Sequence, residues 1–196
     1  MLHFFYGVMG SSKTAQLLMQ RYNLLQRGFK VALVKPAIDT RAGADVVYSR
    51  VGLNATAEIV LQPHHSIKEQ LAWLAIQHAH NDFQFVLIDE AQFLSEQQVV
   101  ELADMSDALE IFCYGLKTDF LGNFFPGSAA LFRLAEDVQE VPGGLCWCGK
   151  KATMNTRVDQ EGNVIKKGEQ VLIDNQSNIR YIGLCYEHWR RGISHA

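Results

Sequence analysis

The sequence lacks three features that would each indicate a different class of protein. The apolar stretch at residues 2–6 is too short to span a membrane and has no basic flank, so neither a signal peptide nor a membrane helix is expected. Basic residues are not in excess, since 18 lysines and arginines stand against 21 aspartates and glutamates, and no general attraction to nucleic acid or membranes is expected. No internal repeat or low-complexity tract appears. These absences favour a globular, cytoplasmic protein.

Cysteine is scarce, with four in 196 residues, and three of the four lie late in the chain. Cys146 and Cys148 are followed, after a hairpin-like stretch, by Cys185 and His188. Two ligand pairs separated by a hairpin are typical of a zinc ribbon, and four sulfur or nitrogen ligands leave no open position, so we predict a structural zinc. The alternative is a set of buried cysteines with an unrelated histidine. Cys113 lies within an apolar run, where a buried, inert thiol is expected.

The opening segment has the order strand, glycine-containing turn and helix. The aromatic run at residues 2–6 has the composition of a buried strand. In a phosphate-binding loop, main-chain N–H groups face an anion, Lys13 neutralises the outer phosphates and the Thr14 hydroxyl can hold Mg²⁺. Ser12 stands where the usual pattern has a second glycine. We favour nucleotide binding over an unrelated strand–turn–helix. The predicted loop comprises Gly7, Val8, Met9, Gly10, Ser11, Ser12, Lys13 and Thr14.

A second buried-strand run, at residues 85–88, ends in two adjacent carboxylates, Asp89 and Glu90. The carboxyl end of a parallel strand is where the metal–phosphate complex sits in nucleotide-binding folds of this kind. If strand geometry continues through the pair, the two side chains point to opposite sides, so that one can serve metal and the other substrate. A solvated acidic strand end is the weaker alternative.

Strand-like and helical patterns alternate along the chain up to Pro142, which predicts an α/β fold with a mostly parallel sheet and helices on both faces. The character changes there, so we expect a nucleotide-binding domain at residues 1–141 and a smaller zinc-ribbon domain at residues 142–196. Buried strands are predicted at residues 2–6, 30–34, 58–61, 85–88, 110–115 and 137–141, and helices at residues 14–27, 66–80, 95–105 and 128–134.

Finer features follow from spacing. The first helix should bury Leu18, Tyr22 and Leu25, and capping boxes should open the helices that follow Ser66 and Ser95. Residues 36–55 read as a loop in which Arg50 is expected to be solvated. The aromatics of a second loop, Phe120, Phe124 and Phe125, could be core residues or a base-stacking surface. His78 and His80 are expected on the surface.

Taken together and in order, these motifs resemble the thymidine kinases of the type shared by many bacteria and the animal cytosol. The likeness covers essentially the whole chain: the phosphate loop, the Asp39-Thr40-Arg41 stretch, residues 88–93, residues 114–120 and the cysteine pairs. It implies a RecA-like P-loop domain with a small zinc-ribbon, or lasso, domain. The expected reaction transfers the γ-phosphoryl group of ATP, with Mg²⁺, to the 5′-hydroxyl of thymidine, giving dTMP and ADP.

The resemblance also implies roles for individual residues. Glu90 matches the general base, Asp89 lies at the metal, Arg41 lies near the phosphates, and Cys146, Cys148, Cys185 and His188 match the zinc ligands. The positions matched to nucleotide contacts are the loop from Gly7 to Thr14 together with Asp89, Glu90, Ala91 and Gln92. The positions matched to the nucleoside pocket and to the loop that closes over thymine are Met9, Arg41, Phe93, Phe125, Gln170, Val171, Leu172, Ile173, Asp174 and Tyr181.

Beyond the site, the resemblance implies a homotetramer inhibited by dTTP, with no nucleic-acid or membrane partner. We expect the polar segment at residues 160–181 to become ordered over the nucleoside. Two rival interpretations remain open: a kinase for another deoxynucleoside, and an ATPase fragment whose ribbon binds nucleic acid. The second is disfavoured because Glu161 and Glu169 interleave with the ribbon's lysines, which are Lys150, Lys151, Lys166 and Lys167.

Overall fold

The structure is a computed structural model, and it describes residues 1–77, 83–170 and 179–195. His78 and His80 therefore lie outside the described residues, as do four of the residues matched to the thymine-closing loop: Val171, Leu172, Ile173 and Asp174. Within the described part of the chain, no helix is both long enough and apolar enough to cross a membrane.

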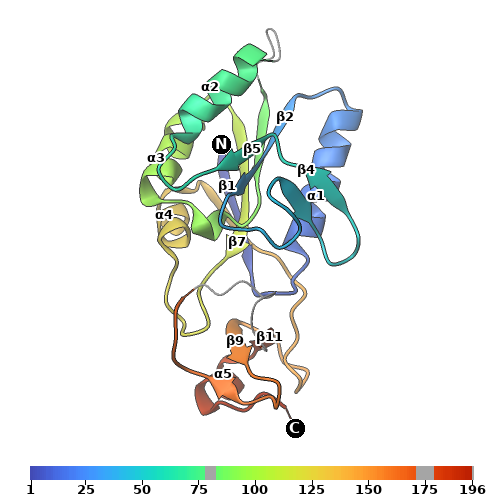
Figure 1. Cartoon of the computed structure of the whole chain (residues 1–196), viewed down its shortest axis with the longest axis vertical. Coiled ribbons are helices and arrows are strands. Elements are labelled where there is room, and N and C mark those ends of the chain that lie inside the picture. The colour runs from blue at the N-terminus through green and yellow to red at the C-terminus, as the bar shows by residue number, and fades with distance from the viewer. Residues whose placement is uncertain (78–82, 171–178, 196) are drawn as a thin grey trace.

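A six-stranded, wholly parallel sheet forms the centre of the fold, as the alternating pattern predicted. Its strands carry the apolar runs recognised in the sequence, and they stand side by side in Figure 1. Across the sheet, the order is β5 (Ile59–Leu61), β2 (Val31–Pro36), β6 (Phe85–Ile88), β7 (Glu110–Leu116), β1 (Leu2–Gly7) and β8 (Asp137–Glu140).

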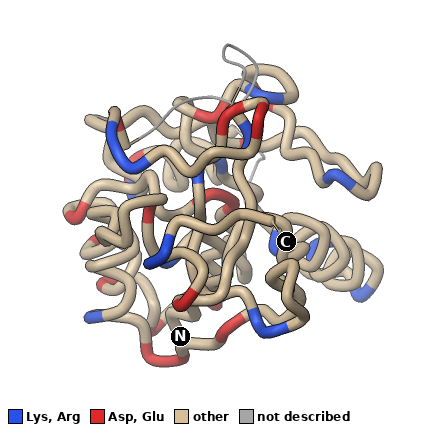
Figure 2. The backbone as a smooth tube through the Cα atoms, turned by 90° about the horizontal axis from the view of Figure 1, so that it is seen from below, with Lys and Arg blue, Asp and Glu red and all other residues tan. Residues whose placement is uncertain are grey.

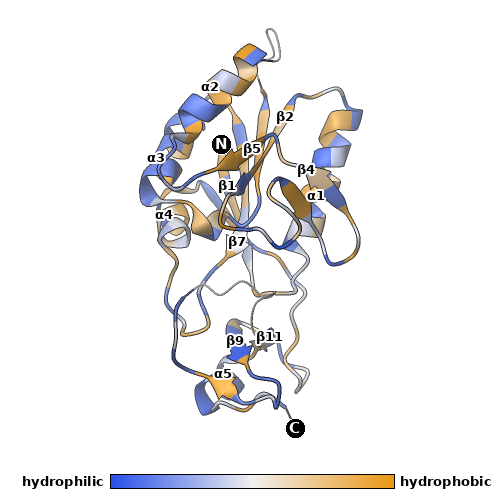
Figure 3. Cartoon of the chain, in the orientation of Figure 1, coloured by the Kyte–Doolittle hydropathy of each residue, from blue (hydrophilic) through white to orange (hydrophobic). Residues whose placement is uncertain are grey.

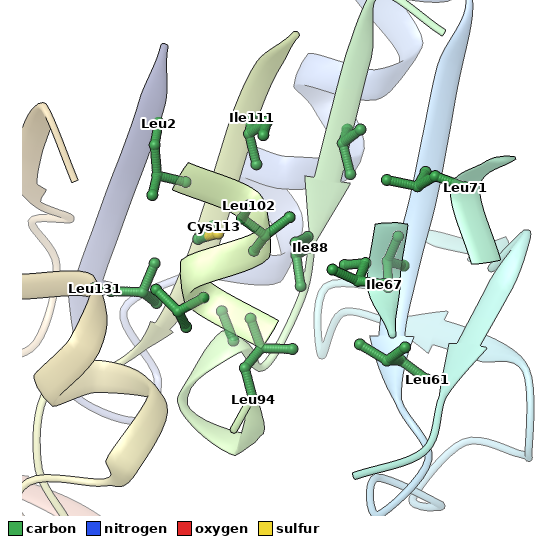
Figure 4. Packing of buried hydrophobic residues seen from close by; sticks show 14 of the residues in the cluster. Leu2, Leu61, Ile67, Leu71, Ile88, Leu94, Leu102, Ile111, Cys113 and Leu131 are labelled. Atoms are coloured by element: carbon green, nitrogen blue, oxygen red, sulfur yellow. The ribbon is translucent and has the colours of Figure 1, made fainter. Parts of the chain in front are cut away.

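Helices cover both faces of this sheet (Figure 1). On one face lie α2 (Ile67–Gln77), α3 (Glu96–Met105) and α4 (Pro126–Leu134), and on the other lies α1 (Lys13–Gln26). Figure 4 shows how leucines and isoleucines from the helices meet those of the strands in the larger core. The strands are the most apolar elements, and α2 and α3 carry hydrophilic segments (Figure 3). Burial of these faces is the main favourable contribution to folding.

The helix starts follow local chemistry. Ser95 and Gln98 exchange both hydrogen bonds of a capping box at the start of α3, as predicted. At α2, only half of the predicted box forms: the Glu69 N–H donates to the Ser66 hydroxyl at 3.2 Å, while that hydroxyl itself donates to Glu101.

The predicted apolar face of α1 is wrong in two of its three residues. Leu18 is buried, but Tyr22 and Leu25 are 62% and 40% exposed. The helix is rotated so that Leu17 and Leu24 accompany Leu18 against the sheet. The i, i+4, i+7 spacing was present in the sequence, but a neighbouring stripe of the helix packs better.

The region predicted as a loop at residues 36–55 contains a small hairpin made of β3 (Val46–Tyr48) and β4 (Asn54–Thr56). Val47 is fully buried and anchors the hairpin in the core beside α1. The hairpin was missed because three-residue strands with polar ends carry too little alternation to be recognised.

The C-terminal part of the chain forms a separate three-stranded antiparallel sheet at the lower end of the view in Figure 1. The strands of this sheet are β9 (Met154–Val158), β10 (Val164–Ile165) and β11 (Arg180–Leu184). The short helix α5 (Tyr186–Arg191) follows β11. The connection from β8 passes close to the turn after β1. A Cβ on Gly144 would lie 2.5 Å from the Val8 side chain, so only glycine allows this approach.

Candidate active site

The turn between β1 and α1 has the geometry of an anion-binding loop. Gly10 and Ser12 both have positive φ, of 81° and 61°. The Lys13 ammonium is folded back over the turn and donates to the Val8 carbonyl at 2.8 Å and to the Ser11 hydroxyl at 3.3 Å. Burial lowers the pKa of Lys13 to about 8, although the nearby carboxylates of Glu90 and Asp89 oppose the shift.

Thr14 and Asp89 meet at the start of α1, where β1 and β6 bring them together. The Thr14 hydroxyl donates to both oxygens of the Asp89 carboxylate, at 3.0 and 3.2 Å. Burial, and then the charge of Glu90, raise the pKa of Asp89 to about 7. A hydroxyl beside a carboxylate is a donor set that suits Mg²⁺, which takes oxygen ligands.

Glu90 diverges from Asp89, but not because strand alternation continues. Its φ of 50° turns the chain into the single 3₁₀ turn η1 (Ala91–Phe93). One oxygen of the Glu90 carboxylate accepts from Arg41 and the other accepts from the Gln92 amide at 2.5 Å. The side-chain amide oxygen of Gln92 in turn accepts from the Leu116 main-chain N–H at 2.9 Å. Two side chains therefore fix the position of the Glu90 carboxylate.

Arg41 also pairs with Asp39, through its Nε at 2.7 Å. Burial alone would raise the pKa of Asp39, but the hydrogen bond and charge of Arg41 outweigh it and lower that pKa below its usual value. Arg41 therefore lies between two carboxylates, and its side chain is 34% exposed.

A cavity of about 260 Å³ opens beside these groups. Phe93 and Phe125 form one part of its wall, with their rings edge to face at 5.7 Å. Of the two other loop aromatics, Phe120 is buried at the cavity, whereas Phe124 is 49% exposed. The residues singled out from the sequence that line the cavity are Met9, Gly10, Ser12, Lys13, Thr14, Arg41, Glu90, Phe93, Phe125, Gln170 and Tyr181.

Most other cavity residues were given no role from the sequence. Arg50 is exposed, as expected, and it also lies at the cavity, where its charge contributes to lowering the pKa of Lys13. Asp39 was part of a recognised motif without an assigned role. Leu116, Thr118, Asp119 and Phe120 belong to the recognised stretch at residues 114–120, and Phe120 was expected either in the core or in a base-stacking surface. The lining residues that no motif indicated are Ile38, Tyr48, Ser49, Val51 and Asn155. Most of them come from the hairpin and from loops that only the tertiary fold brings together.

Asn155 of β9 connects the C-terminal unit with the phosphate loop. Its amide oxygen accepts from the Met9 N–H at 2.8 Å, and its amide nitrogen donates to the Thr118 carbonyl at 2.7 Å. The side chain is only 3% exposed, so both bonds are shielded from water.

The four predicted zinc ligands come together in the C-terminal unit. The ligand atoms of Cys146, Cys148, Cys185 and His188 all lie within 4.8 Å of one another. Burial opposes ionisation of Cys146, but main-chain N–H groups of Cys148 and Cys185 outweigh it and lower the pKa of that thiol to about 6. Three thiol sulfurs and one imidazole nitrogen fit zinc well, whereas Mg²⁺ prefers oxygen. Trp147 stacks on the His188 ring at 4.3 Å between centroids.

The remaining cysteine, Cys113, is fully buried in β7, and burial raises the pKa of its thiol well above the usual value, which fits the expected inert role. Figure 2 views the molecule from the end where the C-terminal unit lies, and the Lys and Arg positions along the chain are interspersed there with Asp and Glu positions. Lys150 pairs with Glu187 at 3.0 Å and Lys151 pairs with Glu140 at 2.5 Å. These pairs partly compensate the charge that the nucleic-acid interpretation requires.

Comparisons with known proteins cover the whole chain. The family model described as thymidine kinase matches residues 1–189. A thymidine kinase of Idiomarina loihiensis is 39% identical over 194 residues, covering 98% of this chain and 97% of the relative. A thymidine kinase of Escherichia coli K12 is 38% identical over 194 residues, covering 98% of this chain and 91% of the relative.

Among solved structures, the Pif1 helicase of Candida albicans aligns with 71% of this chain and 36% of its own, with a TM-score of 0.43 and 12% identity. A likeness at that level has no bearing on function. The full-length matches, in contrast, cover both the phosphate loop and the cysteine cluster. The chain belongs to the thymidine kinase family.

Proposed function

We propose that this protein is a thymidine kinase that transfers the γ-phosphoryl group of ATP to the 5′-hydroxyl of thymidine, giving dTMP and ADP. One observation carries the proposal beyond family membership. A single cavity contains the phosphate-loop residues Lys13 and Thr14, the carboxylate of Glu90 and an aromatic wall of Phe93 and Phe125. Phosphoryl transfer depends mainly on positioning and on neutralising charge, and these groups can supply both.

The phosphate side is assigned to the loop from Gly7 to Thr14. Its main-chain N–H groups and the Lys13 ammonium bind the ATP phosphates, and Lys13 exchanges its contacts with loop carbonyls for contacts with phosphate oxygens. Thr14 and Asp89 would hold Mg²⁺, which supplies charge neutralisation at the phosphates when it is bound. Ala91 and Gln92 belong to the same stretch, and Gln92 acts through Glu90, to which it is hydrogen-bonded.

Glu90 is assigned as the general base. As the 5′-oxygen bonds to the γ-phosphorus, the bond between that phosphorus and the β-phosphate oxygen breaks, and the hydroxyl proton passes to a Glu90 oxygen. Arg41 pairs with Glu90 and lines the same cavity as Lys13 and Thr14, and its role is to turn towards the phosphates when ATP is present. Its positive charge then neutralises part of the charge that the departing ADP carries.

The nucleoside side is assigned to Met9, Phe93, Phe125, Gln170 and Tyr181, which share one cavity. Aromatic walls suit a flat pyrimidine base, which stacks against them. The segment Val171, Leu172, Ile173 and Asp174 is proposed to contribute main-chain hydrogen bonds to thymine, on the basis of the family resemblance.

Zinc is proposed to be structural. Cys146, Cys148, Cys185 and His188 would occupy all four positions of a tetrahedral ion, which leaves none for substrate. A unit of about fifty residues has little core of its own, so a bound metal would stabilise it.

We also propose a homotetramer inhibited by dTTP. A cavity that includes both the phosphate loop and the aromatic wall can accept a nucleoside triphosphate across the two substrate sites.

Exposed apolar side chains on α1, such as Met19 and Tyr22, form a surface that assembly into a tetramer would bury. Light scattering after gel filtration tests the oligomer, and competition by dTTP against both substrates tests the inhibitor mode.

The decisive experiment measures ADP release by the purified protein with Mg²⁺ and each of the four deoxynucleosides in turn. Release that depends on thymidine, with product identified as dTMP, supports the proposal. A greater kcat/KM for another deoxynucleoside would show that the enzyme belongs to the family but has a different substrate.

A further inference from the structure

We infer that Arg157 is a positioning residue of the nucleoside pocket, which holds the two aromatic side chains Phe120 and Tyr181 in the cavity wall. The inference rests on the proposed function, because it concerns the same pocket. Arg157 itself is absent from the cavity lining, whereas Phe120 and Tyr181 both line the cavity. Any effect of Arg157 on the nucleoside would therefore pass through these neighbours.

Arg157 is among the most completely buried residues of the protein, with 1% of its surface exposed. It lies on β9, two residues after Asn155, so both side chains project from the same face of that strand. Asn155 contacts the phosphate loop and Arg157 contacts the aromatic part of the site. This face of β9 therefore supports both halves of the cavity.

Among the residues that the structure describes, the hydrogen bonds of the guanidinium go to neutral groups. Its Nε and one terminal nitrogen donate to the Tyr181 hydroxyl, at 3.0 and 2.7 Å, and the same terminal nitrogen donates to the Glu169 carbonyl at 2.8 Å. A charge buried this deeply is retained only where its donors are satisfied in a fixed geometry. The planar fork of arginine provides that geometry, and a lysine ammonium does not.

The guanidinium also stacks on Phe120, with its central carbon 3.7 Å from the ring centroid. Phe120 belongs to the loop after β7, in the larger part of the molecule, and Tyr181 belongs to β11. A cation–π contact at this distance, shielded from water, is stronger than an exposed one. Arg157 therefore fixes an aromatic ring from each of the two parts of the protein against the same side chain.

Gln170, the residue after Glu169, adds a further contact between the two parts of the protein. The Gln170 amide donates to the Asp119 carboxylate at 3.1 Å, and Asp119 directly precedes Phe120. Three parts of the cavity wall are thus connected through Arg157 and its immediate neighbours: Asp119 with Phe120, Gln170, and Tyr181. A wall held in this way needs less ordering when a base binds, which favours affinity.

The contacts of Arg157 do not include the phosphate side. Lys13, Thr14 and Asp89 bond to the loop and to one another. Loss of the guanidinium should therefore weaken nucleoside binding and leave ATP use nearly unchanged. A general loss of folding would instead lower the active fraction and affect both substrates alike.

The test uses full-length, zinc-loaded protein, four single variants and one double variant. In Arg157→Gln and Arg157→Lys, we expect the KM for thymidine to rise about tenfold, the scale of one charged hydrogen bond, with kcat and the KM for ATP within about threefold of the original. Arg180→Gln, an exposed position beside Tyr181, is the matched control and should change neither KM. Tyr181→Phe removes the hydroxyl that Arg157 binds.

Combining Tyr181→Phe with Arg157→Gln gives a double-mutant cycle, in which the double variant should be little worse than Arg157→Gln alone. Unchanged thymidine KM in both Arg157 variants, or additive effects with Tyr181→Phe, would overturn the inference. Loss of zinc or of folding in both Arg157 variants would also overturn it, since the residue would then be structural. If the wild-type protein showed no kinase activity, the proposed function would be contradicted. Calorimetric binding of thymidine to the wild-type protein and to the variants would still test the role of Arg157.

Discussion

Ser12 shows at the scale of one residue why phosphate loops favour glycine. The position has φ of 61° and ψ of 22°, in the left-handed region, where a Cβ crowds the backbone. Ser12 nevertheless adopts this conformation, because it connects the turn to Lys13 and Thr14, the first two residues of α1. The serine is tolerated and the local backbone strain remains.

Ser12→Gly should relieve that strain. We expect the free energy of unfolding to rise by about 1 kcal/mol, because the left-handed penalty exceeds the extra chain entropy of glycine, and Tm to rise by about two to four degrees. Thermal unfolding checks this. Ser12→Ala keeps a Cβ at the same torsion, so an equal gain in that control would point away from strain as the cause.

Glu90→Gln tests the general base. The variant should still bind ATP and thymidine, because the amide keeps the shape of the side chain, but turnover should fall by about 10² to 10⁴-fold, the usual contribution of proton transfer. Steady-state kinetics combined with calorimetric binding separates the two effects. Turnover close to that of the original protein would assign the base elsewhere.

At the scale of elements, the sequence predicted what local pattern determines. Continuous apolar runs such as Val86 to Ile88 identified most strands of the main sheet, whereas the polar strand β8 was expected as the last member of the alternating series. Ser95 identified the start of α3. The β3–β4 hairpin and the orientation of α1 were not predictable, because they depend on which surfaces are left for packing once the sheet has formed. Tyr22 illustrates this: its spacing suits a core face, yet it is exposed.

The same limit applies to the site. Loop, carboxylates and zinc ligands follow from short motifs, whereas Asn155 and Arg157 are single polar residues in a strand with no motif around them. Their roles arise from contacts with residues more than thirty positions away, such as Thr118 and Phe120. Local sequence patterns do not predict such long-range contacts.

The cysteine cluster leads us to predict the zinc content of the protein and the stability of its C-terminal unit. The purified protein should contain about one zinc per chain, and Cys148→Ser should lose most of it. Because four ligands together contribute about 10–16 kcal/mol in small zinc-folded domains, loss of one should destabilise this unit by about 3 kcal/mol or more. Metal analysis and thermal unfolding measure both effects. Cys113→Ala, which removes a thiol far from the cluster, should retain its zinc; parallel loss in this control would contradict the assignment.

At the scale of the whole molecule, Asn155 is one of several residues through which the C-terminal unit contacts the larger part, and it is the one that bonds to the phosphate loop. Asn155→Leu leaves the Met9 N–H and the Thr118 carbonyl without their partner, which costs about 1–3 kcal/mol for each buried group. We expect lower stability and a higher KM for ATP, because Met9 belongs to the phosphate loop.

Thr156→Val is the matched control for that prediction. The Thr156 hydroxyl is buried on the next residue of β9 and has no hydrogen-bond partner within the described residues, so its removal should be nearly neutral. Thermal unfolding and ATP kinetics of the two variants are compared directly. Equal loss in both would mean that the strand tolerates no substitution, and the link through Asn155 would be contradicted.

The place of β1 in the sheet has a consequence for synthesis on the ribosome. β1 lies between β7 and β8, and it pairs with Ile111–Leu116 of the first and with Asp137–Glu140 of the second. Its aromatic strand therefore leaves the exit tunnel more than a hundred residues before either neighbour and remains unpaired throughout that interval. Such delayed pairing slows folding and exposes the nascent chain to aggregation. We expect chaperones that bind emerging apolar segments to retain this chain until β8 has been translated.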